Sequence, residues 1–434
     1  MTLNKEKITD GIYLSTINTD KFKASILSFS ITRPLSTKVL AYNLILSGLL
    51  RRGTERYPSM AELNRSLDEL YGSYVEIRSS NVGDNVCFSI SAEILDNKYV
   101  PDNTNTLGGV IDIMAQILLF PLVALPDFDE SVFKQECHIV TESLDAEVNN
   151  TRSYSIRRCV ELARGDDYPS IEQIKECVRN ATLDDVLNYY KDMISGAPLD
   201  VFYVGATPYT DICNELREAL AAYPYKNEAR SLNDIASIPF KKSSFQTEKM
   251  PVSQGKLAMA LNTGICADIT DKSYYTAVVL NEILGGSAAS KLFLNVREKM
   301  GLCYHCSSSY SIYTGLIIAS SGFEVANFET VKDAILLQLD EIKRGNITEQ
   351  ELHAAKKSLL NSYRQLYDNP FDLQGFYSGR ALFGITDTID DCLKMIDTVS
   401  VEEITRIAQR ISLDSIFFVE GTGAHSDEEG DENE

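Results

Sequence analysis

The two halves of this 434-residue chain repeat one order of sequence patterns. In the clearest pair, an acidic helix start leads into an amphipathic helix and then into a short apolar strand that ends in glycine. The matching segments are 66–80 with 295–309, 125–150 with 346–369, and 181–205 with 398–421. A repeat of this length means that each half builds the same elements in the same order, so the chain must fold as two related domains.

Each half carries runs of strands and helices that do not alternate regularly. In the first half, 22–32 and 86–94 have strand patterns, while 39–50 and 129–148 have helical patterns. Helices placed between runs of non-parallel strands indicate an α+β fold. We therefore predict two tandem homologous α+β domains, each a sandwich of a sheet with helices.

The predicted domains are 1–225 and 251–422, joined by a linker at 226–250. The linker is polar and has no sustained apolar period, which suits an extended connector. The C-terminal segment 423–434 contains six carboxylates between residues 427 and 434, and we expect it to be a disordered acidic tail.

Composition excludes several classes of partner and compartment. The net charge of −21 disfavours nucleic acid and anionic membranes, because both bind basic surfaces. The N-terminus has no apolar core of signal-peptide length, and no run of about 18 apolar residues could span a bilayer. Nine scattered cysteines, an odd number, are typical of a reducing compartment, so we expect a cytoplasmic protein.

The sequence contains no self-contained catalytic motif. No two of the four histidines lie within five residues of each other, so no single helix face carries a histidine pair for zinc. His138 and Glu142, at i and i+4, are more typical of a solvated pair than of an independent metal site. Cys303 and Cys306 form a lone C-x-x-C, which we interpret as two thiols on one strand.

The segment 284–310 combines a glycine pair, an amphipathic helix and a polar strand. Arg297 lies beside the apolar face of that helix, and Tyr304 follows it by seven positions, so the two side chains can converge on one edge of a cleft. Packing is the alternative role for both. The apolar face of this helix consists of Phe293, Val296 and Met300. Ser287 or Ser290 can cap its N-terminus, and Gly301 ends it.

The run LGGSAASKLFLNVREKMGLCY at 284–304 resembles the signature of the second domain of pitrilysin/insulinase-type metallopeptidases, which are inverted zincins. Segments 20–36 and 254–264 support the resemblance, which extends over residues 5–422. It implies an α/β sandwich with a mostly antiparallel sheet in each domain. It also implies that Arg297 and Tyr304 hold the substrate at the zinc of a facing first domain.

The first domain departs from this family. The family's H-x-x-E-H motif precedes an R-G-T-like turn, and counting back from Gly53-Thr54 places it at three residues that cannot bind zinc or activate water. The glutamate ligand on the following long helix, counted seven residues beyond Glu136, falls on a serine. These degenerate positions are Leu44, Ser47, Gly48 and Ser143. We therefore expect no cofactor in this chain.

The resemblance leaves two functions open. In the first, the chain is the non-zinc subunit of a heterodimeric zinc peptidase. It then supplies Arg297 and Tyr304 for peptide binding and oxyanion stabilisation, while a homologous partner subunit holds the zinc. In the second, it is a structural relative without a catalytic role. An independent enzyme with a metal site around His138 ranks third. We expect the isolated chain to be inactive, and its pairing with itself stays open.

Overall fold

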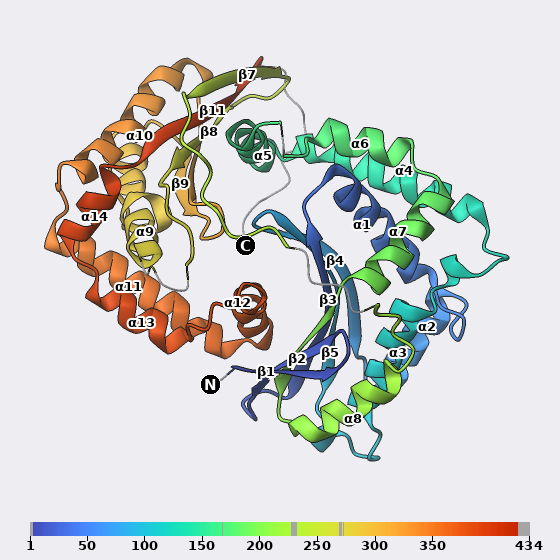
Figure 1. Ribbon diagram of the computed structural model, residues 1–434. Coiled ribbons are helices and arrows are strands. Elements are labelled where there is room, and N and C mark those ends of the chain that lie inside the picture. Colours follow the sequence, from blue (N-terminus) through green and yellow to red (C-terminus); the bar gives the residue numbers. More distant parts are fainter. Residues whose placement is uncertain (1–2, 167, 227–231, 269–270, 272, 424–434) are drawn as a thin grey trace. The chain divides into compact units, whose positions relative to one another are not determined.

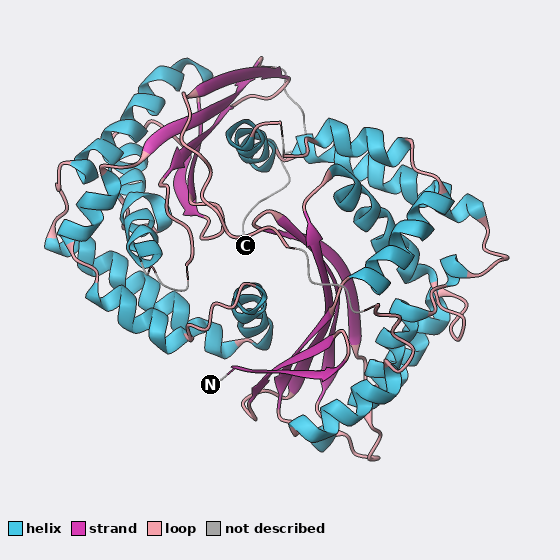
Figure 2. Ribbon diagram, in the orientation of Figure 1, coloured by secondary structure: helices cyan, strands magenta, loops and turns pink. Residues whose placement is uncertain are grey.

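The computed structural model describes residues 3–166, 168–226, 232–268, 271 and 273–423, and it divides into two compact units. Each unit contains one sheet and a set of helices, shown in magenta and cyan in Figure 2. Unit 1 comprises Met1–Leu144, Pro169–Asp234 and Gln365–Thr388, and unit 2 comprises Asp145–Tyr168, Ile235–Arg364 and Ile389–Glu434. The predicted α+β fold is confirmed.

The sheet of unit 1 is antiparallel except for one neighbouring pair, β2 and β6. Its central strand β3 pairs antiparallel with both of its neighbours, and it is buried along most of its length although it contains several serines. In spatial order the strands are β1 (Leu3–Thr9), β2 (Ile12–Asn18), β6 (Leu199–Gly205), β3 (Ala24–Pro34), β5 (Asn85–Leu95) and β4 (Tyr74–Val82).

The two helices predicted in the first half, 39–50 and 129–148, are confirmed as helices at Thr37–Leu49 and Glu130–Ala146. Ser59 caps α2, because its hydroxyl accepts the Glu62 N–H at 3.2 Å and donates to the Glu62 carboxylate at 3.1 Å. The helices from its own half of the chain are α1 (Thr37–Leu49), α2 (Met60–Glu69), α3 (Thr106–Leu119), α4 (Glu130–Ala146), α6 (Ile171–Arg179), α7 (Leu183–Gly196) and α8 (Tyr209–Ala219).

Unit 2 repeats the sheet topology of unit 1. Its strands are, in order, β7 (Ser244–Met250), β11 (Ser412–Gly421), β8 (Gly255–Asn262), β10 (Leu316–Phe323) and β9 (His305–Tyr310), and again only the first pair is parallel. The strands therefore match β2, β6, β3, β5 and β4 one by one, as the sequence repeat predicts. The helices from its own half are α9 (Ser273–Asn281), α10 (Phe328–Lys343), α11 (Glu349–Gln365), α13 (Ile389–Thr398) and α14 (Val401–Ala408).

Strand β7 occupies the end of the segment that we predicted to be a linker. As an edge strand it pairs only with β11, and its side chains alternate between half-buried and exposed. An edge strand of this kind needs no apolar run, so periodicity gave no strand signal there. Residues 227–231 of the predicted linker and residues 424–434 of the predicted tail lie outside the described residues.

Each unit includes one helix from the opposite half of the chain. Helix α5 (Thr151–Arg164) packs in unit 2 against β8 and β11, and α12 (Pro370–Leu382) packs in unit 1 against β6 and β3. In Figure 1, each of these helices lies on the face of its sheet that the unit's other helices leave uncovered. The two sheets are therefore covered on both faces by an exchange of helices between the halves.

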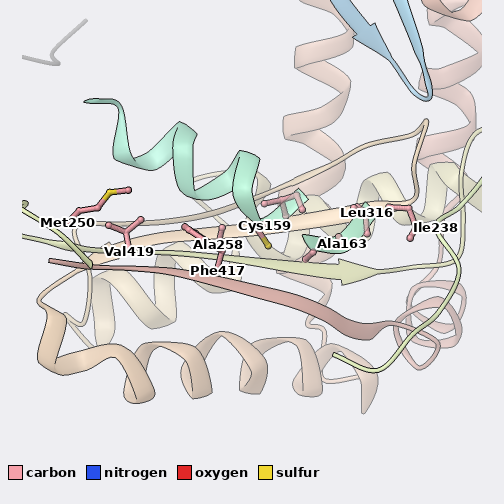
Figure 3. Packing of buried hydrophobic residues seen from close by; sticks show 10 residues of the cluster. Cys159, Ala163, Ile238, Met250, Ala258, Leu316, Phe417 and Val419 are labelled. Atoms are coloured by element: carbon pink, nitrogen blue, oxygen red, sulfur yellow. The ribbon is translucent and has the colours of Figure 1, made fainter. Parts of the chain in front are cut away.

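The contact of α5 with its sheet is built from small and apolar side chains, shown in Figure 3. Cys159 and Ala163 of α5 are fully buried against residues such as Ala258 and Phe417. Small residues on both surfaces let the helix approach the strands closely. The Cys159 thiol donates to the carbonyl of Ser415 at 3.6 Å, and burial raises the pKa of this thiol to about 12.

Two general features of the described residues bear on function. All nine cysteines have free thiols. Among the helices that the structure describes, none combines the length and the apolar character needed to cross a bilayer.

Candidate functional site

The segment 284–310 folds as π-helical turns followed by strand β9. The turns are η5 (Glu282–Gly286) and η6 (Leu292–Lys299), and the Met300 N–H donates to the carbonyl of Asn295, five residues back, at 3.0 Å. The wider turn rotates Met300 outward, so that it is 46% exposed while Val296 is fully buried. The predicted apolar face is therefore wrong at Met300.

The predicted ends of this helix are confirmed at two residues. The hydroxyl of Ser290 accepts the Phe293 N–H at 3.4 Å, which makes Ser290 the capping serine. Gly301 has a φ of +62°, the left-handed conformation that ends a helix. Gly285 lets η5 lie close to β9, because a Cβ there would come within 2.6 Å of the backbone nitrogen of Ser308.

The backbone of Tyr304 is held in place by a hydrogen bond, whereas its side chain is exposed. Its N–H donates to the carbonyl of Gly322 at 2.8 Å, which holds it beside β10, and the residue is 56% exposed. Tyr304 is therefore not a core residue. Its phenol can reach a molecule in solution without displacing any packed side chain.

Arg297 lies at the same end of β9. Its guanidinium carbon is 4.6 Å from the ring centroid of Phe293, and its side chain is 40% exposed. Its charge acts on Cys303 and His305, the two residues that flank Tyr304. Within the described part of the chain no hydrogen bond joins Arg297 to Tyr304, so the structure brings the pair to one region without linking the two side chains.

His305 lies near several positively charged side chains, and the sequence patterns did not predict this arrangement. Burial is the main cause that lowers its pKa to about 4, and the nearby charges of Arg152, Lys256 and Arg297 lower it further. Arg152 also donates to the Ser307 hydroxyl at 3.1 Å. Arg152 belongs to α5, in the other half of the sequence, and no local pattern could have connected it to this strand.

The three positions of unit 1 at which the family resemblance places the zinc motif are Leu44, Ser47 and Gly48, and other interactions occupy them. Ser47 donates its hydroxyl to the carbonyl of Asn43 at 2.8 Å, and Leu44 has no donor atom. A side-chain carbon at Gly48 would collide with the carboxylate of Glu136, which lies against this turn of α1. Ser143, two turns further along α4 than Glu136, is exposed.

Glu136 is neutralised by an arginine. The residue is 5% exposed, and its Oε1 accepts the Nε–H of Arg52 at 2.5 Å, with a second contact from Nη2 of the same guanidinium. A buried carboxylate needs such a partner because its desolvation is costly. The donor set at Leu44, Ser47 and Gly48 does not fit zinc, and an arginine cation already compensates the nearest acid.

The third candidate, a metal site around His138, lacks further ligands. His138 Nε2 lies 3.1 Å from Glu142 Oε1, and the two side chains are 70% and 66% exposed. They form the solvated i, i+4 pair that the sequence favoured. Across the described residues, no group of three or more histidine, cysteine, aspartate or glutamate side chains is arranged to hold a metal ion.

Some known proteins are similar to nearly all of this chain, and others are similar to only a part of it. Residues 180–359 match the family model described as the peptidase M16 inactive domain. The probable inactive metalloprotease YmfF of Bacillus subtilis is 29% identical over 95% of this chain and 96% of its own length. The uncharacterized zinc protease YmxG of the same organism is 27% identical over 39% of this chain and 43% of its own length.

Solved structures share the fold. A conserved protein from Enterococcus faecalis V583 has a TM-score of 0.88 and 25% identity, covering 98% of this chain and all 100% of that protein. A peptidase M16 inactive domain from Pseudomonas fluorescens has a TM-score of 0.77 at 15% identity, covering 98% of this chain and 100% of that domain. These comparisons show that the chain is similar to inactive members of the M16, pitrilysin/insulinase-type, peptidase family.

Proposed function

We propose that this chain is the non-zinc subunit of a two-chain zinc peptidase, and that Arg297 and Tyr304 bind the peptide at the zinc site of a homologous partner subunit. The observation that carries this proposal is the exposed phenol of Tyr304, held on a backbone that β10 fixes. In unit 1, by contrast, Glu136 lies against Gly48 and pairs with Arg52. In this proposal the chain carries the assisting residues, and the partner subunit carries the metal ligands.

In this proposal the residues of the chain act on the substrate through charge and hydrogen bonding. The partner's zinc supplies the activated water. The Tyr304 hydroxyl donates a hydrogen bond to the oxyanion that develops on the peptide carbonyl. The Arg297 guanidinium holds a backbone carbonyl of the same peptide, so that the reacting bond is correctly oriented.

The environment of Arg297 supports the binding of a group that becomes negative. Arg152 and Lys256 add positive charge around His305, and the low pKa of His305, about 4, keeps the imidazole itself uncharged near neutrality. A local positive field within a chain of net charge −21 favours an oxyanion at this position over most others on the surface. We also propose a cytoplasmic location, supported by the nine free thiols.

A structural role without catalysis is the second candidate. It is favoured by the similarity to YmfF, a probable inactive metalloprotease that matches nearly the full length of the chain. In this case the exposure of Tyr304 would have no consequence for peptide hydrolysis. The two candidates therefore differ in one measurable property, the dependence of a complex's activity on Arg297 and Tyr304.

The test is co-expression of the chain with a homologous subunit that carries H-x-x-E-H, followed by peptide hydrolysis assays. Tyr304→Phe removes one oxyanion donor, and we expect turnover to fall by about 10²–10³-fold. Arg297→Ala should also lower it strongly. The matched control is Tyr74→Phe, which changes a 58% exposed tyrosine on β4, the strand equivalent to β9.

Full activity in both the Arg297 and Tyr304 variants would exclude the assisting role and favour the structural one. Metal analysis of the isolated chain gives an independent check. We expect no stoichiometric zinc, because Leu44, Ser47 and Gly48 offer no ligand set. A one-to-one zinc content would instead indicate an independent metal site.

A further inference from the structure

Unit 2 contains a cavity of about 430 Å³ that is lined by helices α9, α13 and α14 and by the segment that follows β8. Helix α9 packs against both α13 and α14 (Figure 1). Sites for small molecules have volumes of roughly 300–1,000 Å³, so this cavity is large enough for a small ligand. All of its lining residues belong to unit 2, and neither Arg297 nor Tyr304 is one of them.

The buried part of the lining is apolar. Ile265, Val399 and Ile407 are each less than 9% exposed, and Met395 is half-buried. The hydroxyl of Tyr275, which also lines the cavity, lies 3.1 Å from the sulfur of a cysteine on α13, so this polar atom is already engaged. A surface of this kind binds the aliphatic or aromatic part of a ligand.

Four charged side chains line the same cavity, namely Asp271, Glu403, Arg406 and Arg410. Glu403 is half-buried, and the other three are exposed. Within the described part of the chain, none of the four takes part in an ion pair. Two positive and two negative groups thus surround one cavity without pairing with each other.

The hydrogen bonds of the two acids leave their charges uncompensated. Asp271 accepts the N–H and the hydroxyl of Ser273 at 2.8 and 2.9 Å, and Glu403 accepts the N–H of Ser400 at 2.9 Å. These donors are neutral, and an ionised carboxylate has about four acceptor sites, so each acid can accept a further donor. The two acids are therefore held in place and still able to bind a cationic group.

We propose that this cavity binds a small zwitterion with an apolar side chain, namely a free α-amino acid or a dipeptide. The ligand carboxylate pairs with Arg406 and Arg410, because a guanidinium group matches the geometry of a carboxylate. The ligand ammonium group pairs with Glu403 or Asp271, and the side chain of the ligand lies on the apolar lining around Met395. This site does not depend on the proposed peptidase function.

Ligands with one charge or none fit the cavity less well. An anion pairs with the arginines, but the two carboxylates of the same cavity repel it, and a cation meets the opposite arrangement. An uncharged apolar molecule takes water from charged groups and gives no partner in return. A zwitterion supplies a partner for each sign of charge and leaves the net charge of the cavity unchanged.

The test follows the methyl group of Met395 by NMR, using the full chain labelled with ¹³C-methyl methionine. Met395→Leu assigns its signal among the eight methionines. Leucine and leucyl-leucine are added separately at millimolar concentrations. We expect a saturable shift of the Met395 signal, while Met114 of unit 1 stays unchanged. The tighter of the two dissociation constants tells whether the site takes a free amino acid or a dipeptide.

Analogues of the ligand test the two charges separately. The N-acetylated form of the tighter ligand lacks the ammonium charge, and its C-terminal amide lacks the carboxylate. Each analogue keeps the apolar side chain. Because a hydrogen bond to a charged group contributes about 1.5–3 kcal/mol, each analogue should bind at least about tenfold more weakly.

Substitutions test the protein side of the same contacts. Arg406→Gln and Arg410→Gln should each weaken binding by about tenfold. Glu403→Gln should also weaken it, although glutamine can keep the capping box with Ser400 at the start of α14. The matched control is Lys394→Gln, which changes a 77% exposed cation of α13 outside the cavity and should leave binding unchanged. Circular dichroism verifies the fold of each variant.

The proposal is overturned if neither leucine nor leucyl-leucine shifts the Met395 signal of the wild-type chain in a saturable manner, and this result needs no variant. Equal affinity of the charged ligand, its N-acetylated form and its amide would also overturn it, because the four charged side chains would then play no part. The measurement uses the isolated chain. Its outcome is therefore separate from the peptidase assay that tests Arg297 and Tyr304.

Discussion

Unit 1 and unit 2 share a sheet topology, yet the charged side chains of interest lie in different surroundings in the two units. In unit 1 the carboxylate of Glu136 packs against Gly48 and is neutralised by Arg52. In unit 2 Arg297 and Tyr304 stay partly or largely exposed at the start of β9. A duplicated fold thus preserves strand order and pairing, whereas the chemistry of each copy depends on a few side chains.

The sequence repeat shows which residues of the first half stand at the positions of Arg297 and Tyr304. Asp68 and Val75 occupy the places in the first half that Arg297 and Tyr304 occupy in the second. Val75 lies within β4 and pairs with Ala92 of β5, so its position is a regular part of the sheet. Under the proposed function, the buried pair of unit 1 contributes to stability and the exposed residues of unit 2 contact other molecules. Substitutions can test each side of this contrast.

The largest effect on stability is expected from Arg52→Ala in unit 1. This change leaves the Glu136 carboxylate, 6% exposed at its side chain, without its guanidinium partner. Removing one partner of a buried ion pair typically costs about 3–5 kcal/mol, and the partial exposure of Arg52 argues for about 3 kcal/mol. Urea unfolding followed by circular dichroism measures the change.

The matched control for that substitution is Arg56→Ala. Arg56 pairs with Asp112, but the two side chains are 56% and 41% exposed, so the loss should be below about 1 kcal/mol. Equal destabilisation by the two changes would show that the burial of the Glu136–Arg52 pair adds nothing to its contribution to the stability of unit 1.

A smaller effect is expected from Tyr154→Phe, which tests the exchanged helix α5 in unit 2. The Tyr154 hydroxyl donates to the Glu248 carboxylate at 3.0 Å, and burial together with Glu248 raises the pKa of Tyr154 to about 12. Losing a hydrogen bond to a charged group should cost about 2 kcal/mol. Thermal unfolding checks this value against Tyr99→Phe, a change at a 44% exposed tyrosine of unit 1 that should have almost no effect.

A different kind of effect, a change in the pH dependence of stability, is expected on replacing His305. Burial holds the pKa of folded His305 at about 4, below the ordinary histidine pKa of 6.5, so between these pH values the unfolded chain binds a proton that the folded chain does not. The free energy of unfolding should therefore fall as the pH drops from 6.5 toward 4. His305→Gln should make the free energy of unfolding less dependent on pH, by an amount that corresponds to at most about one bound proton.

Denaturant unfolding at several pH values measures the slope of the free energy of unfolding against pH. His138→Gln is the control, because the side chain of His138 is 70% exposed on α4. If the His305 variant keeps the full slope of the wild-type chain, the imidazole is not buried among Arg152, Lys256 and Arg297 as the structure has it. The cationic surrounding assigned to unit 2 would then have to be revised.

Local patterns predicted elements well where local interactions decide them. The Ser59 cap, the Ser290 cap and the Gly301 helix end were all predictable, since each depends on residues within one turn. The π-helical turn that exposes Met300 was not, because its wider winding follows from packing of η5 and η6 on β9 and α10. Strand β7 escaped detection for the related reason that an edge strand needs no apolar run.

The sequence by itself determined the duplication, the α+β class, the absence of a metal-binding side chain set at Leu44, Ser47 and Gly48, and the presence of Arg297 and Tyr304. Each of these is a property of residue identity or spacing. The tertiary structure alone decided that α5 and α12 change places between the units, that Arg52 neutralises Glu136, and that Arg152 approaches His305. Periodicity states that a face is buried but not which distant segment covers it, so these contacts exist only once the chain has folded.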